Sequence, residues 1–208
     1  MHMLHYIRLH EPDYPTSILR HLGQDAPSCI TALGNLDILQ RKTVALFCSI
    51  KCPGDVIVRT YDLARVLRDA GVTVIGGFHT PMEQECLALL LRGSQPLIVC
   101  PARGIGTMRI PVPWREPIAE GRLLLLSPFD DKHHRVTAAL AHQRNRWVAA
   151  LAVEIIVAYA SAGSNTETLA CEALASGKPV YTLPLAVNQG LVQHGAQAID
   201  AGLWHTRT

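Results

Sequence analysis

The sequence lacks the long apolar segments that membrane proteins and secreted precursors carry. No stretch reaches the roughly 20 apolar residues of a membrane-spanning helix. The N-terminal stretch MHMLHYIRLHEPDYP contains no apolar core of a signal peptide. We therefore expect a cytoplasmic protein with no part in a membrane.

A strong net charge is also missing, because the formal charge is only +2. A value this small gives no argument for nucleic acid by itself. The distribution of charge is more informative, since nine basic and only four acidic residues lie between Arg92 and Arg146, and arginine outnumbers lysine fifteen to four. Arginine binds phosphate through paired hydrogen bonds, so a phosphate ligand is one explanation. A solvated basic surface is the other.

Clear metal and cofactor motifs are absent as well. The six cysteines are scattered, mostly in apolar segments, which suits reduced thiols in the core of a cytosolic protein. Cys48 and Cys52 are the only close pair, and no second pair or histidine cluster accompanies them. The chain has neither a complete G-x-G-x-x-G motif nor a Walker A motif, which argues against dinucleotide oxidoreductases and P-loop NTPases. We expect no metal and no cofactor.

Short apolar strands and helices alternate from Thr43 onward. Strands are predicted at 44–49, 72–77, 96–100, 122–127, 153–160 and 180–184, and helices at 57–70, 81–93, 114–120, 135–151, 167–176 and 189–201. Strands that are apolar on both faces indicate a mostly parallel sheet with helices on both faces. We therefore predict an α/β fold of the Rossmann-like, doubly wound type over residues 43–208. Residues 1–42 are expected to form an irregular or helical lead-in that packs on this domain.

Ligands of doubly wound sheets bind at the carboxyl ends of the strands, so the loops that follow strands are the candidate site. The loop before residue 167 leads into a helix N-terminus, where N–H groups and the helix dipole favour an anion. An Arg-Asn-Arg triplet lies on the long helix just upstream. Turn formation and helix capping explain each loop taken alone. The predicted phosphate-binding residues are Ser49, Lys51, Gly77, Arg103, Arg144, Asn145, Arg146, Gly163 and Ser164.

Acid–base chemistry has weaker candidates. His79 and Glu83 follow the same strand closely, and a carboxylate at the start of a helix is also explained by capping. No Ser-His-Asp or Cys-His arrangement can be assigned by spacing. The main hypothesis therefore includes no catalytic residue.

The order of these motifs resembles the DprA/Smf DNA-processing family, within the wider Rossmann-like group that includes the LOG-type phosphoribohydrolases. The resemblance spans about residues 14–200. The matching motifs are Tyr14-Pro15, Gly34-Asn35, Cys48-Ser49-Ile50-Lys51, Gly76-Gly77, Arg144-Asn145-Arg146, Ala162-Gly163-Ser164, Gly177-Lys178, Leu183-Pro184 and Gly195-Ala196.

The resemblance implies binding of single-stranded DNA without metal or cofactor, loading of a RecA-type recombinase, and a role in natural transformation. It places Lys51 where the family has a DNA-contacting arginine, and Gly163 and Ser164 on the loop that contacts phosphate. The family forms dimers through this domain, so a homodimer is expected. Apolar residues near the C-terminal end would be covered by a partner subunit or by the chain's own sheet; they are Leu191, Val192, Leu203 and Trp204.

Some positions depart from the family pattern. Ala141-His142 stands where the family usually has Phe-Pro, so a base-stacking aromatic residue is missing. Many members also carry a C-terminal winged helix, which we do not expect in a chain that ends at Thr208. The alternative function is a nucleotide-binding protein or LOG-like phosphoribohydrolase, in which Glu83 or Glu167 assists N-glycosidic cleavage. A structural or regulatory oligomer without a ligand is the third possibility.

Overall fold

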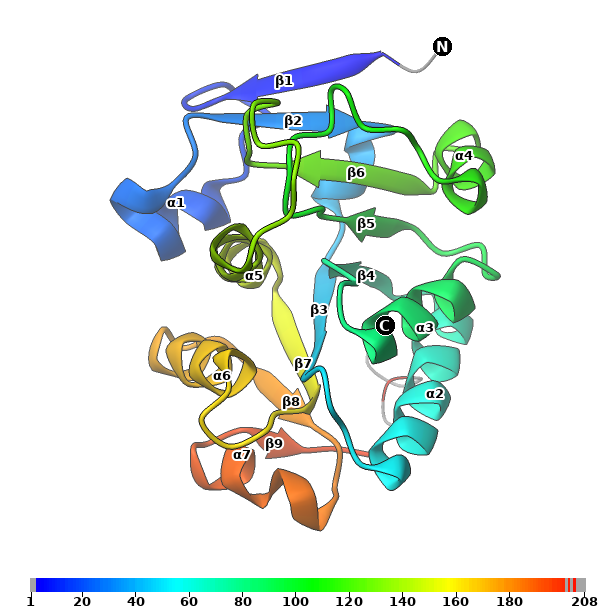
Figure 1. The fold of residues 1–208 in the computed structure, drawn as a ribbon, viewed down its shortest axis with the longest axis vertical. Helices are drawn as coiled ribbons and strands as arrows, with labels where there is room; N and C mark the ends of the chain where they lie inside the picture. Colours follow the sequence, from blue (N-terminus) through cyan, green and yellow to red (C-terminus); the bar gives the residue numbers. More distant parts are fainter. Residues whose placement is uncertain (1–2, 201, 203, 205–208) are drawn as a thin grey trace.

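A single nine-stranded sheet, covered by helices on both faces, organises the computed structural model, which describes residues 3–200, 202 and 204 (Figure 1). The strands lie in the order β1-β2-β6-β5-β4-β3-β7-β8-β9. From β6 through β9 the neighbouring strands are parallel, whereas β1 and β2 are antiparallel to their neighbours. The predicted α/β, Rossmann-like fold class is confirmed.

The elements follow the predicted alternation from residue 43 onward. The strands are β1 (Leu4–Arg8), β2 (Cys29–Leu33), β3 (Thr43–Cys48), β4 (Thr73–Gly76), β5 (Leu97–Val99), β6 (Leu123–Ser127), β7 (Glu154–Tyr159), β8 (Val180–Thr182) and β9 (Gln197–Ala198). The α-helices are α1 (Thr16–Leu22), α2 (Gly54–Asp69), α3 (Pro81–Leu90), α4 (Val112–Ala119), α5 (Ala138–Leu151), α6 (Asn165–Ala175) and α7 (Gln189–Gln193). Short 3-10 helices are η1 (Gly23–Asp25), η2 (Leu36–Gln40) and η3 (Ala186–Asn188). Within the described part of the chain, every helix is too short or too polar to cross a bilayer.

The order of the strands reverses next to β3. The chain first adds β4, β5 and β6 on one side of β3, and then places β7, β8 and β9 on the other side. At such a reversal the two loops that leave β3 and β7 diverge to opposite faces, and a crevice opens between them at the carboxyl edge. The topology therefore places the best position for a ligand between the loops that follow β3 and β7.

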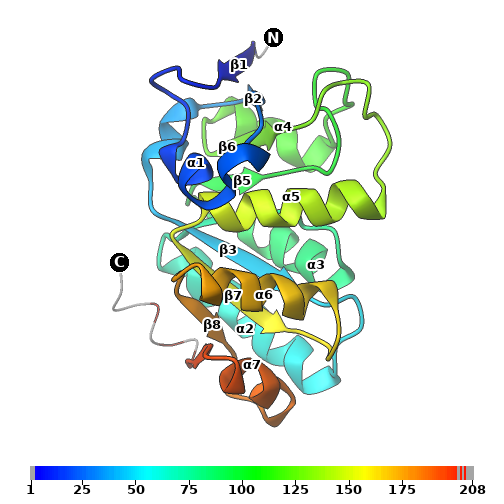
Figure 2. The same cartoon turned by 90° about the vertical axis from the view of Figure 1, so that its left-hand side faces the viewer.

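Two hydrophobic cores lie on opposite faces of the sheet. Helices α2, α3 and α4 cover one face, and α1, α5 and α6 cover the other (Figures 1 and 2). Alternate residues of β3 supply both cores, with Leu46 in the first, and Ala45 and Phe47 in the second. This alternation explains why strands of the central sheet are apolar on both faces.

The expectation of an irregular or helical lead-in is wrong for two segments of it. β1 and β2 join the main sheet, and β2 pairs with β6 through Thr31 opposite Ser127. This pairing connects residues far apart in sequence, so local turn signals could not reveal it. The domain boundary near residue 42 stays a prediction, but the sheet itself continues across that position.

The helix predicted over 189–201 is also wrong beyond its first turn. α7 ends at Gln193, Gly195 has a φ of 110°, and β9 then pairs with β8. A φ in this range favours glycine and ends the helix. Leu191 and Trp204 are 2 % exposed and pack within the chain, so they do not form a surface for a partner, while Leu203 is outside the described residues.

We predict that the lead-in and the central sheet unfold as one unit. Ile30 of β2 is 1 % exposed in the same core as α5, so Ile30→Ala is expected to destabilise the whole chain by roughly 2–5 kcal/mol. Urea unfolding followed by both circular dichroism and tryptophan fluorescence measures this. Met3→Ala, at a residue that is 74 % exposed, is the control and should change stability little. A separate early transition with an unchanged main transition would show that the lead-in is an independent unit.

Candidate anion-binding site

A cavity of about 520 Å³ opens at the carboxyl edge of the sheet, where the strand order reverses. Its walls come from the loops that follow β3, β4 and β7 and from the first turns of α5 and α6. Lys51 is an exposed basic residue in its wall, and His79 and His142 also line the cavity. The cavity therefore sits where the topology favours a ligand.

Three helix N-termini meet at this cavity. Thr80 caps α3, Ala138 begins α5, and Asn165 begins α6, and all three residues line it. The N-terminal N–H groups and the helix dipoles create a positive potential that favours an anion. Glu83 is the one carboxylate among the lining residues, and it is only 5 % exposed. The accessible charges of the cavity thus all favour a negatively charged ligand.

Glu83 links the end of β3 to the loop that follows β4. One carboxylate oxygen, Oε1, accepts the N–H of Cys48 at 3.0 Å, and the other, Oε2, accepts the N–H groups of His79 at 2.9 Å and Thr80 at 3.3 Å. Burial raises the pKa of Glu83, and the three N–H donors together with the positive charge of Arg144 partly offset that effect. Main-chain donors bond to both oxygens, so in this structure Glu83 positions the backbone around it.

Arg144 forms part of the floor of the cavity. The residue is 2 % exposed, and its Nη1 donates to the carbonyl of Cys100 at 2.7 Å while its Nε donates to Oδ1 of Asn145 at 2.7 Å. A Cβ added at Gly77 would lie 1.5 Å from Nη1, so the guanidinium packs directly on the glycine backbone. Burial lowers the pKa of Arg144, and the nearby charge of Glu83 raises it. Arg144 therefore joins the ends of β4 and β5 to α5.

Ser49 connects the loops after β3 and β7 across the strand reversal. Its Oγ accepts the N–H of Ser161 at 3.0 Å and lies 3.4 Å from Oγ of Ser164. Ser49 is 5 % exposed, so its hydroxyl serves mainly to fix the two loops against each other. The spacing between the β3 loop and the N-terminus of α6 is thus set by a direct hydrogen-bond link.

Glu167 stabilises the turn that leads into α6. Its Oε2 accepts the N–H of Gly163 at 2.6 Å, and Oγ of Ser164 accepts the N–H of Glu167 at 3.2 Å. Gly163 has a φ of 70°, a conformation that glycine adopts without strain. The reciprocal bonds act as a helix cap.

The cavity brings together most of the predicted phosphate-binding residues. Ser49, Lys51, Arg144, Asn145 and Ser164 line it. Gly77 lies against the guanidinium of Arg144, and Gly163 directly precedes Ser164. The structure thus places these seven residues in or beside one cavity, with Arg144 buried.

Arg146 and Arg103 lie elsewhere. Two residues along a helix are about 200° apart around its axis, so Arg146 projects away from Arg144. It forms ion pairs with Asp25 at 3.4 Å and Glu172 at 3.5 Å. Arg103 follows β5, where its Nε donates to the carbonyl of Gly104 at 3.3 Å and its own carbonyl accepts the hydroxyl of Ser127. Neither residue lines the cavity.

Several lining residues were not among the predicted phosphate-binding residues. His142, Asn165 and Thr166 all line the cavity. Their position in the first turns of helices that start at the carboxyl edge was the available signal. In the described segments, no three His, Cys, Asp or Glu side chains are arranged to hold a metal ion. The six cysteines are free.

Comparisons with known proteins agree on one family. Residues 5–204 match the family model described as DNA recombination-mediator protein A. The X-ray structure of DNA processing protein A from Streptococcus pneumoniae has a TM-score of 0.80 and 20% identity, and the match covers 97% of this chain and 72% of that chain. DNA processing protein A from Helicobacter pylori, described as having a unique single-stranded DNA binding mode, has a TM-score of 0.77 and 21% identity, covering 97% of this chain and 94% of that chain.

A more distant structure shares only the fold. The molybdenum cofactor binding protein from Rippkaea orientalis has a TM-score of 0.56 and 13% identity, with 78% of this chain and 92% of that chain covered. The search of curated protein sequences gave no match.

We predict that Gly77 and Arg144 are energetically coupled. Gly77→Ala should displace the guanidinium and destabilise the chain, and Arg144→Ala should cost on the order of 3 kcal/mol because the buried Glu83 loses its nearby positive charge. In the Arg144→Ala background, Gly77→Ala should cost much less, since the clashing group is gone. Thermal and urea unfolding of the double-mutant cycle measures the coupling.

Gly54→Ala is the matched control for this cycle. A Cβ at Gly54, at the start of α2, meets no atom within 4 Å, so the change should be close to neutral in both backgrounds. Equal costs of Gly77→Ala with and without Arg144 would contradict the packing described for this pair.

Proposed function

The chain belongs to the DNA recombination-mediator protein A family, and on that basis we propose that it serves DNA processing by binding single-stranded DNA in the cavity at the carboxyl edge. One observation supports this most strongly. Lys51 and the N-termini of α3, α5 and α6 converge on a cavity whose only carboxylate is the buried Glu83. This charge arrangement favours an anion, and the family match makes the phosphate backbone of a DNA strand the proposed one.

The backbone phosphates would make the main contacts. One phosphate would sit between Lys51 and the N-terminus of α6, where the N–H groups of Asn165 and Thr166 lie beside the cavity. Contacts of this kind depend on the charge and spacing of the phosphates and do not distinguish the bases. Binding would therefore depend on salt concentration and be nearly independent of the DNA sequence.

His142 offers a partial replacement for the missing aromatic residue. Ala141 and His142 both line the cavity at the place where the family usually has Phe-Pro. An imidazole ring can stack on a nucleobase, as larger aromatic rings do in proteins that bind single strands. A base next to the bound phosphate would therefore lie against His142, with less stacking area than a phenylalanine provides.

We also propose the further steps that the family resemblance implies. The bound strand would be passed to a RecA-type recombinase during recombination or natural transformation, and the protein would act in the cytoplasm as a homodimer. Six free cysteines suit a reducing compartment. Leu191 and Trp204 are buried within the chain, so a dimer would need other residues at its interface.

The alternative, cleavage of a small nucleotide by a LOG-like phosphoribohydrolase, has less support from the geometry. Both oxygens of Glu83 accept main-chain N–H groups, and Glu167 caps α6 through Gly163. An acid that assists N-glycosidic cleavage must reach the ribose or the base. Glu83 is 5 % exposed, and Glu167 does not line the cavity.

We predict that Lys51 contributes one phosphate contact. Lys51→Ala should weaken binding of a single-stranded oligonucleotide to a similar extent for different base sequences. It should also flatten the dependence of log K on log salt concentration by about 0.7, the value for one contact on a single strand. Fluorescence anisotropy with a labelled oligothymidine and a mixed-sequence strand, each over a salt series, measures both effects.

Lys42→Ala is the matched control, because Lys42 is exposed just before the amino end of β3, at the opposite edge of the sheet from Lys51. It should leave affinity and salt slope nearly unchanged. An equal loss in both variants would mean that the cavity is not the binding site. Incubation with AMP in the same series tests the alternative, since release of adenine would favour the phosphoribohydrolase function.

A homodimer at micromolar concentration is a separate prediction. Sedimentation velocity should give a species of about twice the 22.7 kDa chain mass. A single species at the monomer mass up to about 50 µM would contradict it. The dissociation constant of any dimer would then be at least about ten times higher than a micromolar value.

A further inference from the structure

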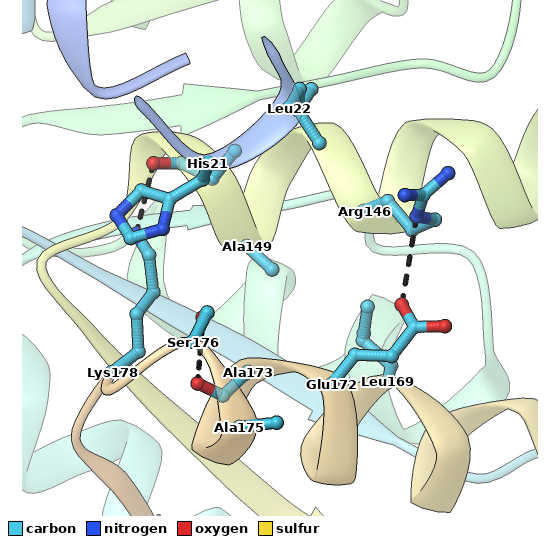
Figure 3. A pocket seen from close by; sticks show the side chains of 11 residues that line it. His21, Leu22, Arg146, Ala149, Leu169, Glu172, Ala173, Ala175, Ser176 and Lys178 are labelled. Atoms are coloured by element: carbon cyan, nitrogen blue, oxygen red, sulfur yellow. Dashed lines mark hydrogen bonds and ion pairs between the residues drawn. The ribbon is translucent and has the colours of Figure 1, made fainter. Parts of the chain in front are cut away.

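A second cavity, of about 510 Å³, lies between α1, α5 and α6 on one face of the sheet (Figure 3). It shares no lining residue with the first cavity. The first cavity contacts the N-terminal turns of α5 and α6, whereas this one follows the later turns of the same helices. The two cavities are therefore distinct places on the molecule.

The two ends of this cavity differ in chemistry. His21 and Lys178 lie together at one end, and Arg146 with Glu172 lies at the other (Figure 3). Small and apolar side chains line the space between them, among them Leu22, Ala149 and Ala173. The cavity thus combines an apolar middle with polar ends, which is the usual composition of small-molecule sites.

Lys178 is a buried cation without a carboxylate partner among the described residues. It is 8 % exposed, and its Nζ donates to the carbonyl of Ala150 at 2.9 Å and to the carbonyl of Ala152. These carbonyls lie at the C-terminal end of α5, where a cation is favoured. An ammonium has three N–H donors, and these two bonds leave the third for another acceptor.

The acidic side chains near this cavity form ion pairs at the end opposite Lys178. Arg146 pairs with both Glu172 and Asp25, so those carboxylates are not available to Lys178. Arg20 and His21 of α1 lie near Lys178 and add no negative charge. Burial first, and then the charge of Arg20, lower the pKa of Lys178 to about 8. A desolvated ammonium of this kind gains free energy when an anion pairs with it.

We propose that this cavity binds a small amphipathic anion, a carboxylate or phosphate monoester on an apolar body. The anionic group pairs with Lys178 beside His21. The apolar body lies along Leu22, Ala149 and Ala173, toward the Arg146 end. A volume of about 510 Å³ is within the range of small-molecule pockets.

The proposal predicts a defined pH dependence. His21 and Arg20 from α1 lie near Lys178, while Arg146 from α5 and Glu172 from α6 lie at the far end of the cavity, with Asp25 of η1 paired to Arg146. Burial, and then the charges of Lys178 and Arg20, lower the pKa of His21 from its usual range, which favours the neutral imidazole. Lys178 carries its charge below about pH 8, so anion affinity should be high there and fall as the pH rises through that value. Conversely, a bound anion should raise the pKa of Lys178.

Nuclear magnetic resonance of the full chain with isotope-labelled lysine tests this directly. The probes are benzoate and phenyl phosphate, and benzyl alcohol is the uncharged control. We expect a saturable shift of the Lys178 signal at millimolar concentrations of at least one anion, and a rise of about 1 unit in its titration midpoint. No shift with either anion at about 20 mM, or an equal response to benzyl alcohol, would overturn the proposal.

Ala173→Leu separates binding from the structural role of Lys178. The larger side chain should fill the middle of the cavity and weaken the anion response at least tenfold, while the titration midpoint of Lys178 without ligand stays in place. Lys51→Ala, in the first cavity, should leave the response unchanged. An unaltered response in Ala173→Leu, or a loss in Lys51→Ala, would place the anion elsewhere and refute the assignment.

Discussion

The buried charges of Glu83 and Arg144 hold the carboxyl edge of the sheet in its observed form. Glu83 accepts N–H groups from the last residue of β3 and from the loop after β4, and Arg144 donates to the carbonyl of Cys100, just after β5, while packing on Gly77. Two charges out of water are costly unless their hydrogen-bonding groups are satisfied. The three loops must therefore stay in register with these side chains, and the cavity takes its shape from that requirement.

In this arrangement the buried charged groups shape the cavity, and the exposed groups are the ones a ligand can reach. The charged residues with the most hydrogen bonds at the site, Glu83 and Arg144, form its floor. In the proposed function, the ligand is contacted by Lys51, by the histidines and by the main-chain N–H groups at the starts of the helices, all of which line the cavity. Main-chain donors are already fixed before a ligand arrives, so binding costs little ordering entropy. A site built in this way suits repeated phosphate groups better than one particular base.

Helices α5 and α6 each serve two cavities. Their first turns border the carboxyl edge, and their later turns border the cavity that contains Lys178. Arg144 and Arg146 illustrate the division, because one lies beneath the first cavity and the other pairs with Glu172 beside the second. The same helix thus contributes to two regions whose charges are balanced in different ways.

Periodicity and strand composition in the sequence determined the α/β class, the alternation of elements after residue 43 and the edge where the loops meet. Those features depend on neighbouring residues and on the general rule that parallel strands share a carboxyl edge. Only the tertiary structure decided that β1 and β2 join the sheet, that Arg144 is buried, and that Glu83 binds main-chain N–H groups. Each of these depends on contacts between segments distant in sequence, since β2 meets β6 and Glu83 meets Cys48 only after the chain has folded. A sequence motif indicates which residues belong to a site, but the packing of the folded chain determines which of them face the solvent.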